Sequence, residues 1–107
     1  MSSEYALKFM PQAKRDLEEI YSYISTELSN EPAAIKLIDK IEQALRSLKK
    51  SPKRCPISDN PELAIKGYRK CVIANYIALY KTDDEQKQII VTKVFYGRRN
   101  YANLGLY

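Results

Sequence analysis

Apolar residues recur every three or four positions through the first half of the chain, a spacing that places them along one face of an α-helix. Two such stripes are present, one made of Ala13, Leu17, Ile20, Ile24 and Leu28, and the other of Ala34, Ile38, Ile41, Leu45 and Leu48. Few residues separate the two stripes. We therefore predict two amphipathic helices that pack against each other as an antiparallel hairpin.

Residues beside the two stripes indicate where each helix begins and ends. Pro11 and Pro32 fit the first turn of a helix, where the missing N–H would have no partner in any case. Asn30 can cap the second helix. The pair Ser51-Pro52 stops it, because the residue before a proline avoids the helical conformation.

The second half of the chain changes to a period of two, which is typical of β-strands. Strand-like runs span residues 68–72, 76–81 and 89–95, and a further short run spans residues 4–9, with Tyr5, Leu7 and Phe9 on one side. Asn75 is a turn former between the first two of these runs, and the polar residues 82–86 indicate a hairpin turn before the last one.

The run 89–95 is apolar on both faces, which predicts a central strand with the helices covering one side of it. Strict alternation places Ile89, Val91, Lys93 and Phe95 on one face and Ile90, Thr92, Val94 and Tyr96 on the other. Before the strands, the loop 51–62 contains three prolines and is expected to be neither helix nor strand.

These elements predict one α+β domain over residues 1–107, in the order β-α-α-β-β-β. The helical hairpin should pack on one face of a mostly antiparallel four-stranded sheet, leaving no helices on the other face. No helix longer than about three turns is expected after residue 60.

Composition supports a globular protein, since 45% of the 107 residues are hydrophobic and 29% are charged. No apolar run could span a membrane and the N-terminus lacks a leader's apolar segment, so we expect no membrane contact and a cytoplasmic location. Cys55 and Cys71 are then expected to be small buried thiols and not a disulfide. With no histidine in the chain, a zinc site is not expected, and we expect no cofactor.

Charge is distributed unevenly along the chain. Residues 46–70 carry a net charge of +6 and residues 86–107 a net charge of +4, whereas residues 1–45 carry −3. If the two basic segments meet in space, they form a face suited to a polyanion. An ordinary lysine-rich solvated surface is the alternative.

Several kinds of catalytic site are excluded or poorly supported. The lack of histidine removes the commonest general base at neutral pH and every Ser-His-Asp or Cys-His arrangement. Carboxylates on the predicted helices, such as Asp16, Glu18, Glu19 and Glu42, are expected to face solvent. Only three glycines are present, and none builds a phosphate-binding loop.

Two glycines precede segments that combine arginine with tyrosine: Gly67-Tyr68-Arg69-Lys70 and Gly97-Arg98-Arg99-Asn100-Tyr101. Arginine matches phosphate oxygens with a planar fork, and a tyrosine ring can stack on a base. Because the second and fourth strands can flank the third, Arg69 could approach the Arg98-Arg99 pair. Alternatively, Arg69 and Arg99 form salt bridges with Asp83, Asp84 or Glu85, and Tyr101 packs on the sheet edge.

Nearly the whole chain resembles the RelE/ParE toxin superfamily. The similar stretches, in order, are residues 13–24, 48–52, 67–69, 75–81 and 94–101. The resemblance implies a microbial-RNase-like fold, a type II toxin-antitoxin system, and a cognate antitoxin protein as partner.

The resemblance also implies two possible targets. A RelE-like toxin cleaves mRNA on the ribosome. Its catalytic residues are matched by Arg69, by Arg99 (or Arg98, if the alignment shifts by one residue) and by Tyr101, for which Tyr107 is the alternative. Its substrate-binding basic residues are matched by Lys53 and Arg54, or by a set that includes Lys66, together with Arg98. A ParE-like toxin inhibits DNA gyrase and is not a nuclease.

In the nuclease mechanism, the RNA 2′-hydroxyl attacks the adjacent phosphate without a metal, the two arginines clamp that phosphate, and Lys53 or Lys66 acts as base. The sequence favours this metal-independent endoribonuclease, with gyrase inhibition as the alternative and a non-toxic RNA-binding module as a third class.

Overall fold

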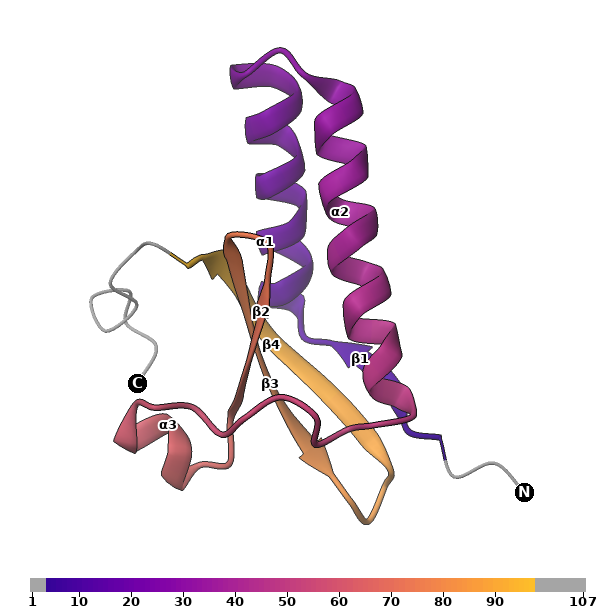
Figure 1. The fold of residues 1–107 in the computed structure, drawn as a ribbon, viewed down its shortest axis with the longest axis vertical. Helices are drawn as coiled ribbons and strands as arrows, with labels where there is room; N and C mark the ends of the chain where they lie inside the picture. The colour runs from indigo at the N-terminus through magenta and orange to yellow at the C-terminus, as the bar shows by residue number, and fades with distance from the viewer. Residues whose placement is uncertain (1–3, 98–107) are drawn as a thin grey trace.

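The computed structural model describes residues 4–97, and its elements follow the predicted order with one addition. They are β1 (Ala6–Phe9), α1 (Pro11–Ser22), α2 (Glu31–Arg46), α3 (Pro61–Ile65), β2 (Arg69–Ile73), β3 (Tyr76–Asp83) and β4 (Gln88–Tyr96). Helices α1 and α2 form an antiparallel hairpin packed on the sheet and extend beyond its strands (Figure 1). The predicted α+β fold is confirmed.

Helix α2 begins and ends where the sequence indicates. The side chain of Asn30 accepts a hydrogen bond from the N–H of Ala33 at 3.2 Å, so it caps the helix as predicted. After Arg46 a 3₁₀ turn covers Ser47–Lys49, directly before the Ser51-Pro52 stop. Its apolar stripe faces inward, because Ile41, Leu45 and Leu48 are fully buried.

Helix α1 ends differently from the prediction, because a π-helical turn, Tyr23–Glu27, follows it. The N–H of Leu28 bonds to the carbonyl of Tyr23, five residues back. This wider turn breaks the 3.6-residue period on which the stripe was based. Leu28, predicted as the last buried member of the stripe, is consequently exposed.

The sheet order is β1-β4-β3-β2, with β1 parallel to β4 and the other pairs antiparallel. Strand β4 is therefore central, as predicted. The predicted strict alternation of side chains along β4 is wrong beyond Val91. Tyr80 pairs with Val91, but the preceding residue Leu79 pairs with Lys93. Thr92 is therefore an extra residue in a β-bulge. Val94 consequently packs on the helical side.

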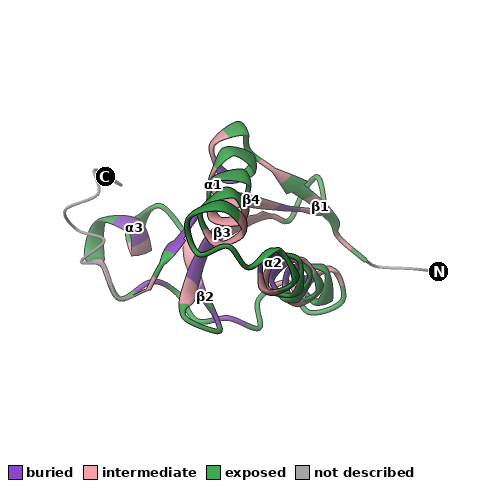
Figure 2. Ribbon diagram, turned by 90° about the horizontal axis from the view of Figure 1, so that it is seen from above, coloured by how far each residue is buried: buried purple, intermediate pink, exposed green. Residues whose placement is uncertain are grey.

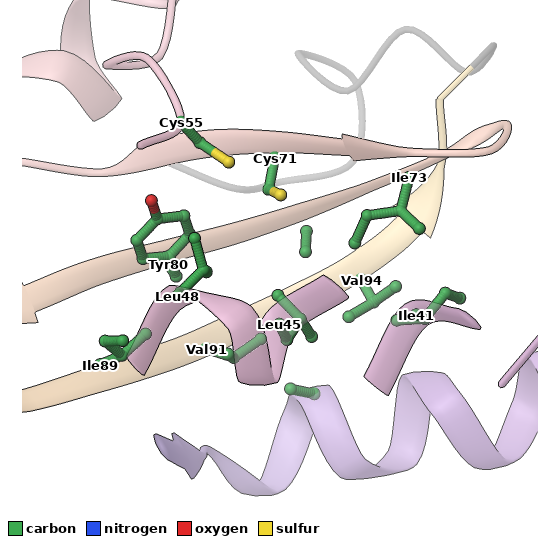
Figure 3. Packing of buried hydrophobic residues seen from close by; sticks show 12 residues of the cluster. Ile41, Leu45, Leu48, Cys55, Cys71, Ile73, Tyr80, Ile89, Val91 and Val94 are labelled. Carbon is green, nitrogen blue, oxygen red and sulfur yellow. The ribbon is translucent and has the colours of Figure 1, made fainter. Parts of the chain in front are cut away.

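The main core lies between the helical hairpin and the sheet (Figure 3). Buried residues, purple in Figure 2, also occur on the other face. There a second cluster joins Leu63 of α3 to Ile77, Leu79 and Phe95. Helix α3 therefore covers part of the face that was expected to carry no helix.

Helix α3 corrects the prediction that residues 51–62 have no regular structure. The side chain of Asn60 accepts hydrogen bonds from the N–H groups of Glu62 and Leu63, at 3.0 and 3.1 Å, and Pro61 occupies the first turn. Asn60-Pro61 is thus a helix start like the one before α2. The apolar side chains on the sheet's second face give the short helix something to pack against.

Cys55 and Cys71 are both buried and free, as expected. No helix within residues 4–97 is long and apolar enough to cross a membrane.

Candidate functional site

Residues 51–58, which we call the basic loop, carry Lys53 and Arg54 and run along the outer edge of β2. The N–H of Lys70 donates to the carbonyl of Pro56, and the N–H of Ser58 to that of Tyr68, both at 2.9 Å. An isolated antiparallel bridge joins Ile57 to Arg69 between these two bonds. The loop is therefore held to the sheet by main-chain bonds on one side.

Arg69 fastens the same loop through its side chain. Its Nη1 donates to the carbonyl of Cys55 at 2.7 Å and to that of Lys53 at 3.3 Å. Sequence reasoning offered either a phosphate clamp or salt bridges with residues 83–85 for this arginine. The contacts observed are with main-chain carbonyl groups, so Arg69 positions the loop that carries Lys53 and Arg54.

Lys53 forms the ion pair that the sequence suggested for Arg69. Its Nζ lies 2.9 Å from Oδ2 of Asp84, in the β3–β4 turn. The hydroxyl of Tyr5 donates to Oδ1 of the same carboxylate at 2.8 Å. The hydrogen bond from Lys53, followed by that from Tyr5, lowers the pKa of Asp84, and the bond to Asp84 raises the pKa of Tyr5.

Arg54 and Lys66, the other predicted substrate-binding residues within residues 4–97, do not take part in the ion pair between Lys53 and Asp84. Nη2 of Arg54 donates to the carbonyl of Ala44 near the end of α2 at 3.4 Å, and the arginine is exposed. Lys66 is the exposed C-cap of α3. The structure thus brings Lys53, Arg54 and Arg69 to one loop and places Lys66 on a separate element.

Arg98, Arg99 and Tyr101 lie outside the described residues. The strand register does show where β4 ends relative to Arg69. Arg69 pairs with Tyr80, which pairs with Val91, whereas Tyr96 pairs with Tyr76, which pairs with Ile73. Strand β4 therefore ends beside the far end of β2 from Arg69, about 13 Å along the strand at 3.3 Å per residue.

A second candidate site is an open groove of about 940 Å³ between the α1 side of the hairpin and the ends of β3 and β4. Its lining is mainly apolar and aromatic, from Ile20, Tyr23, Ile24, Leu28, Leu37, Tyr76, Val94, Phe95 and Tyr96. Glu19 and Lys93 add charge to its wall. Sequence reasoning missed this groove, because it exists only where the hairpin extends past the sheet and the π turn redirects the stripe.

Aromatic residues form one end of the groove. The rings of Tyr76 and Tyr96 meet edge to face, with centroids 5.6 Å apart. Burial raises the pKa of Tyr76, with smaller contributions from Tyr96 and Tyr23. The hydroxyl of Tyr76 therefore stays a neutral donor at physiological pH, so the groove combines apolar walls with a hydrogen-bonding group.

Asp16 lines the groove, and the prediction that its carboxylate faces solvent is wrong. Its Oδ2 accepts a hydrogen bond from the N–H of Val94 at 2.9 Å, and its Oδ1 accepts one from the side chain of Gln12 at 2.8 Å. A carboxylate that binds a main-chain N–H of another element has a structural role. Only the spatial approach of α1 to β4 reveals it.

Comparison with known families decides the classification. Residues 7–101 match the family described as the ParE toxin of the type II toxin-antitoxin system parDE. The chain belongs to the ParE toxin family. The resemblance to the RelE/ParE superfamily that the sequence carries is thereby confirmed. A search of the curated proteins finds no match.

Solved structures show the same fold in ParE and RelE proteins. The chromosomal ParDE system of Pseudomonas aeruginosa aligns with a TM-score of 0.73 and 20% identity, over 89% of this chain and 98% of that one. The RelBE2 toxin-antitoxin complex of Mycobacterium tuberculosis aligns with a TM-score of 0.59 and 23% identity, over 87% of this chain and 91% of that one. A mutant of the E. coli toxin RelE in the free state aligns with a TM-score of 0.66 and 14% identity, over 94% of this chain and 92% of that one.

Proposed function

We propose that this ParE-family toxin arrests growth by binding DNA gyrase, using the basic loop as part of its contact surface. The observation that carries the proposal is the way the charged groups of this loop are engaged. Arg69 donates to two carbonyl groups of the loop, and Lys53 is paired with Asp84. These contacts hold the loop in one shape and leave Arg54 exposed on it. Membership of the ParE family supports the same target.

A nuclease needs more than a fixed basic surface. The mechanism also needs a base close to the 2′-hydroxyl. Of the two lysines considered for this role, Lys53 is paired with the carboxylate of Asp84, and Lys66 lies at the end of α3, apart from the basic loop. The phosphate clamp also requires Arg69 to be available to phosphate oxygens, whereas its Nη1 donates to the carbonyl groups of Cys55 and Lys53. Gyrase inhibition places neither demand on these residues.

Ribosome-dependent mRNA cleavage stays the second candidate, because Lys53, Arg54 and Arg69 meet at one loop. On that mechanism Arg69 and Arg99 would stabilise the phosphorane, Tyr101 would orient the RNA, and Arg98 and Lys66 would bind it. We expect the toxin to need no bound cofactor of its own in either mechanism.

Two assays, one on the purified toxin and one on cells that express it, distinguish the targets. We expect it to block supercoiling of relaxed plasmid by gyrase, and we expect mRNA from arrested cells to show no translation-dependent cuts by primer extension. Discrete cuts together with unaffected supercoiling would reject gyrase as the target and establish the nuclease.

A matched pair of double variants tests the part played by the basic loop. Lys53→Ala with Arg54→Ala should weaken gyrase inhibition about tenfold or more, since each lost charged contact typically contributes 1.5–3 kcal/mol. Lys36→Ala with Lys40→Ala removes the same charge from exposed positions of α2 and should inhibit like the wild type. Equal inhibition by both double variants would exclude the loop from the gyrase interface.

We further propose that a cognate antitoxin inserts apolar side chains into the groove between α1 and the sheet. Two structural neighbours belong to toxin-antitoxin pairs, the ParDE system of Pseudomonas aeruginosa and the RelBE2 complex of Mycobacterium tuberculosis. Here the groove is open, has a volume of about 940 Å³ and is lined by apolar and aromatic side chains, with Glu19 and Lys93 available for polar contacts. A concave site that combines apolar walls with a few polar groups can accept side chains of a protein partner.

Leu28 and Ile35 provide a controlled test of antitoxin binding, because both are 55% exposed and only Leu28 lines the groove. Leu28→Asp should keep its toxicity but escape the antitoxin, so that cells expressing both proteins still stop growing. Ile35→Asp should remain neutralised. If the antitoxin protects cells from Leu28→Asp as fully as from the wild type, the groove is not its binding site.

A further inference from the structure

The main-chain register places the two cysteines of the chain directly opposite each other. The bridge between Ile57 and Arg69 is antiparallel. Two residues back along the basic loop from Ile57 is Cys55, and two residues forward along β2 from Arg69 is Cys71. Continuing the register from the bridge therefore pairs Cys55 with Cys71.

The pair falls at the type of position that suits a disulfide. Hydrogen bonds connect Lys70 to Pro56 and Ser58 to Tyr68, so these are the hydrogen-bonded pairs of the ladder. The pairs between and beyond them are non-hydrogen-bonded, with Cα atoms typically about 4.5 Å apart and side chains close together. A disulfide accepts Cα separations of about 4.4–6.8 Å.

The side chains are already in contact. In Figure 3 the sulfur atoms of Cys55 and Cys71 lie beside each other, next to Tyr80 in the main core. Burial and the hydrogen bond with the Cys55 thiol raise the pKa of Cys71 to about 12. Both cysteines are buried, Cys55 with 8% and Cys71 with 4% of its surface exposed, so a small oxidant reaches them only from the side of the basic loop or through brief opening of that loop.

We propose that Cys55 and Cys71 form a dithiol site that a hydroperoxide oxidises to an intramolecular disulfide. The sulfur of Cys55 attacks one oxygen of hydrogen peroxide, the O–O bond breaks, and one water leaves as Cys55 becomes a sulfenic acid. The sulfur of Cys71 then attacks the Cys55 sulfur, the S–O bond breaks, and a second water carries away the remaining proton. Two thiols lose two hydrogen atoms, and the peroxide is reduced to two waters.

The new bond fixes the basic loop to β2 at a point where only non-covalent contacts now hold it. It closes a ring over residues 55–71, which includes α3, and so restricts the unfolded chain. Arg69, which binds the carbonyl of Cys55, lies beside the bond. Oxidation therefore stabilises the loop that carries Lys53 and Arg54, and this inference does not depend on which target the toxin attacks.

Mass spectrometry of the full chain tests the chemistry. Reduced toxin is treated with hydrogen peroxide, denatured, and alkylated with N-ethylmaleimide. We expect a monomer that has lost two hydrogen atoms, takes up no maleimide, and recovers both alkylation sites after dithiothreitol. Tryptic digestion should yield residues 55–66 linked to residues 71–81. Two alkylatable thiols after treatment, stepwise addition of oxygen without a cross-link, or disulfide-linked dimers would each overturn the proposal.

Single variants and a melting experiment complete the test. Cys55→Ser and Cys71→Ser cannot form the internal bond, so each should gain oxygen or keep one alkylatable thiol under the same treatment. The oxidised wild type should melt on the order of 10 °C above the reduced protein. An unchanged or lower melting temperature would refute the stabilisation of the loop, even if the cross-link forms.

Discussion

The carboxylate of Asp16 on α1 accepts a hydrogen bond from the main-chain N–H of Val94 on β4, at 2.9 Å. Val94 is buried and follows the bulge at Thr92 by two residues. The bond ties the helical hairpin to the central strand at the base of the groove. Its loss would leave a buried N–H group without its partner, which is more costly than the net contribution of the bond itself.

Asp16→Ala should therefore lower the free energy of unfolding by about 1–3 kcal/mol. Asp16→Asn keeps an oxygen acceptor of the same shape and should cost less than half as much. Urea denaturation followed by circular dichroism measures both values. Equal losses for the two variants would mean that the negative charge matters, and not the acceptor geometry.

Ala74 lies in the β2–β3 turn with φ at +54°, in the left-handed region where a side chain is strained. Ala74→Gly removes the strain, at the cost of a more flexible unfolded chain. We expect a net stabilisation of about 0.5–1 kcal/mol. Ala64→Gly, within α3, is the control and should destabilise the protein.

Arg69→Ala should loosen the basic loop without unfolding the domain, because the guanidinium donates to the main-chain carbonyl groups of Lys53 and Cys55 in this loop. The loss should be about 1.5–3 kcal/mol, as for hydrogen bonds from a charged donor. Hydrogen exchange should accelerate at the amides of Ser58 and Lys70, which bond the loop to β2. Arg46→Ala, which removes only an exposed ion pair with Glu42, should leave these amides unchanged.

The lowered pKa of Asp84 predicts how its contacts depend on pH. A carboxyl group whose pKa is depressed by folding contributes stability above its unfolded pKa and loses it as pH falls through the folded value. The contacts of Asp84 should therefore persist at neutral pH and break below pH 3.8, its ordinary pKa. Because the group is exposed, we expect only a small change in overall stability.

NMR titration of the Asp84 carboxyl measures this effect directly. Lys53→Met should move the Asp84 pKa back toward its ordinary value further than Tyr5→Phe does, because the hydrogen bond from Lys53 is the larger cause. If Tyr5→Phe has the larger effect, the hydroxyl and not the ammonium group determines the pKa.

Residue spacing was sufficient to predict the elements that depend on local contacts, and the strand that is apolar on both faces. The second helical stripe, which ends in Leu45 and Leu48, and the cap at Asn30 depend on local periodicity and local hydrogen bonds, and both were confirmed. The central position of β4 followed from its two apolar faces.

The features that were missed depend on three-dimensional context. The bulge at Thr92 results from strand pairing, and alternation alone cannot reveal an extra residue. The π turn rotates Leu28 out of the predicted core. Helix α3 is too short for a periodic pattern, although Asn60-Pro61 carried a readable start signal.

The sequence predicted which residues lie in the candidate site more successfully than it predicted their contacts. Arg69 and Lys53 do lie at one loop, but the sequence could not show that the arginine binds carbonyl groups or that the lysine pairs with Asp84. The roles of Arg69, Arg99 and Tyr101 in catalysis stay predictions.

The parallel pairing of β1 with β4 determines when the protein can fold during synthesis. Leu7 is paired with Ile89 and Phe9 with Val91, so the first strand has no partner until almost the whole chain has left the ribosome. Contacts between such distant segments form slowly, because a long stretch of chain must be brought together first. The helical hairpin can form earlier, from local contacts. A ribosome that stops before β4 therefore releases a chain that can form the hairpin but cannot complete the sheet.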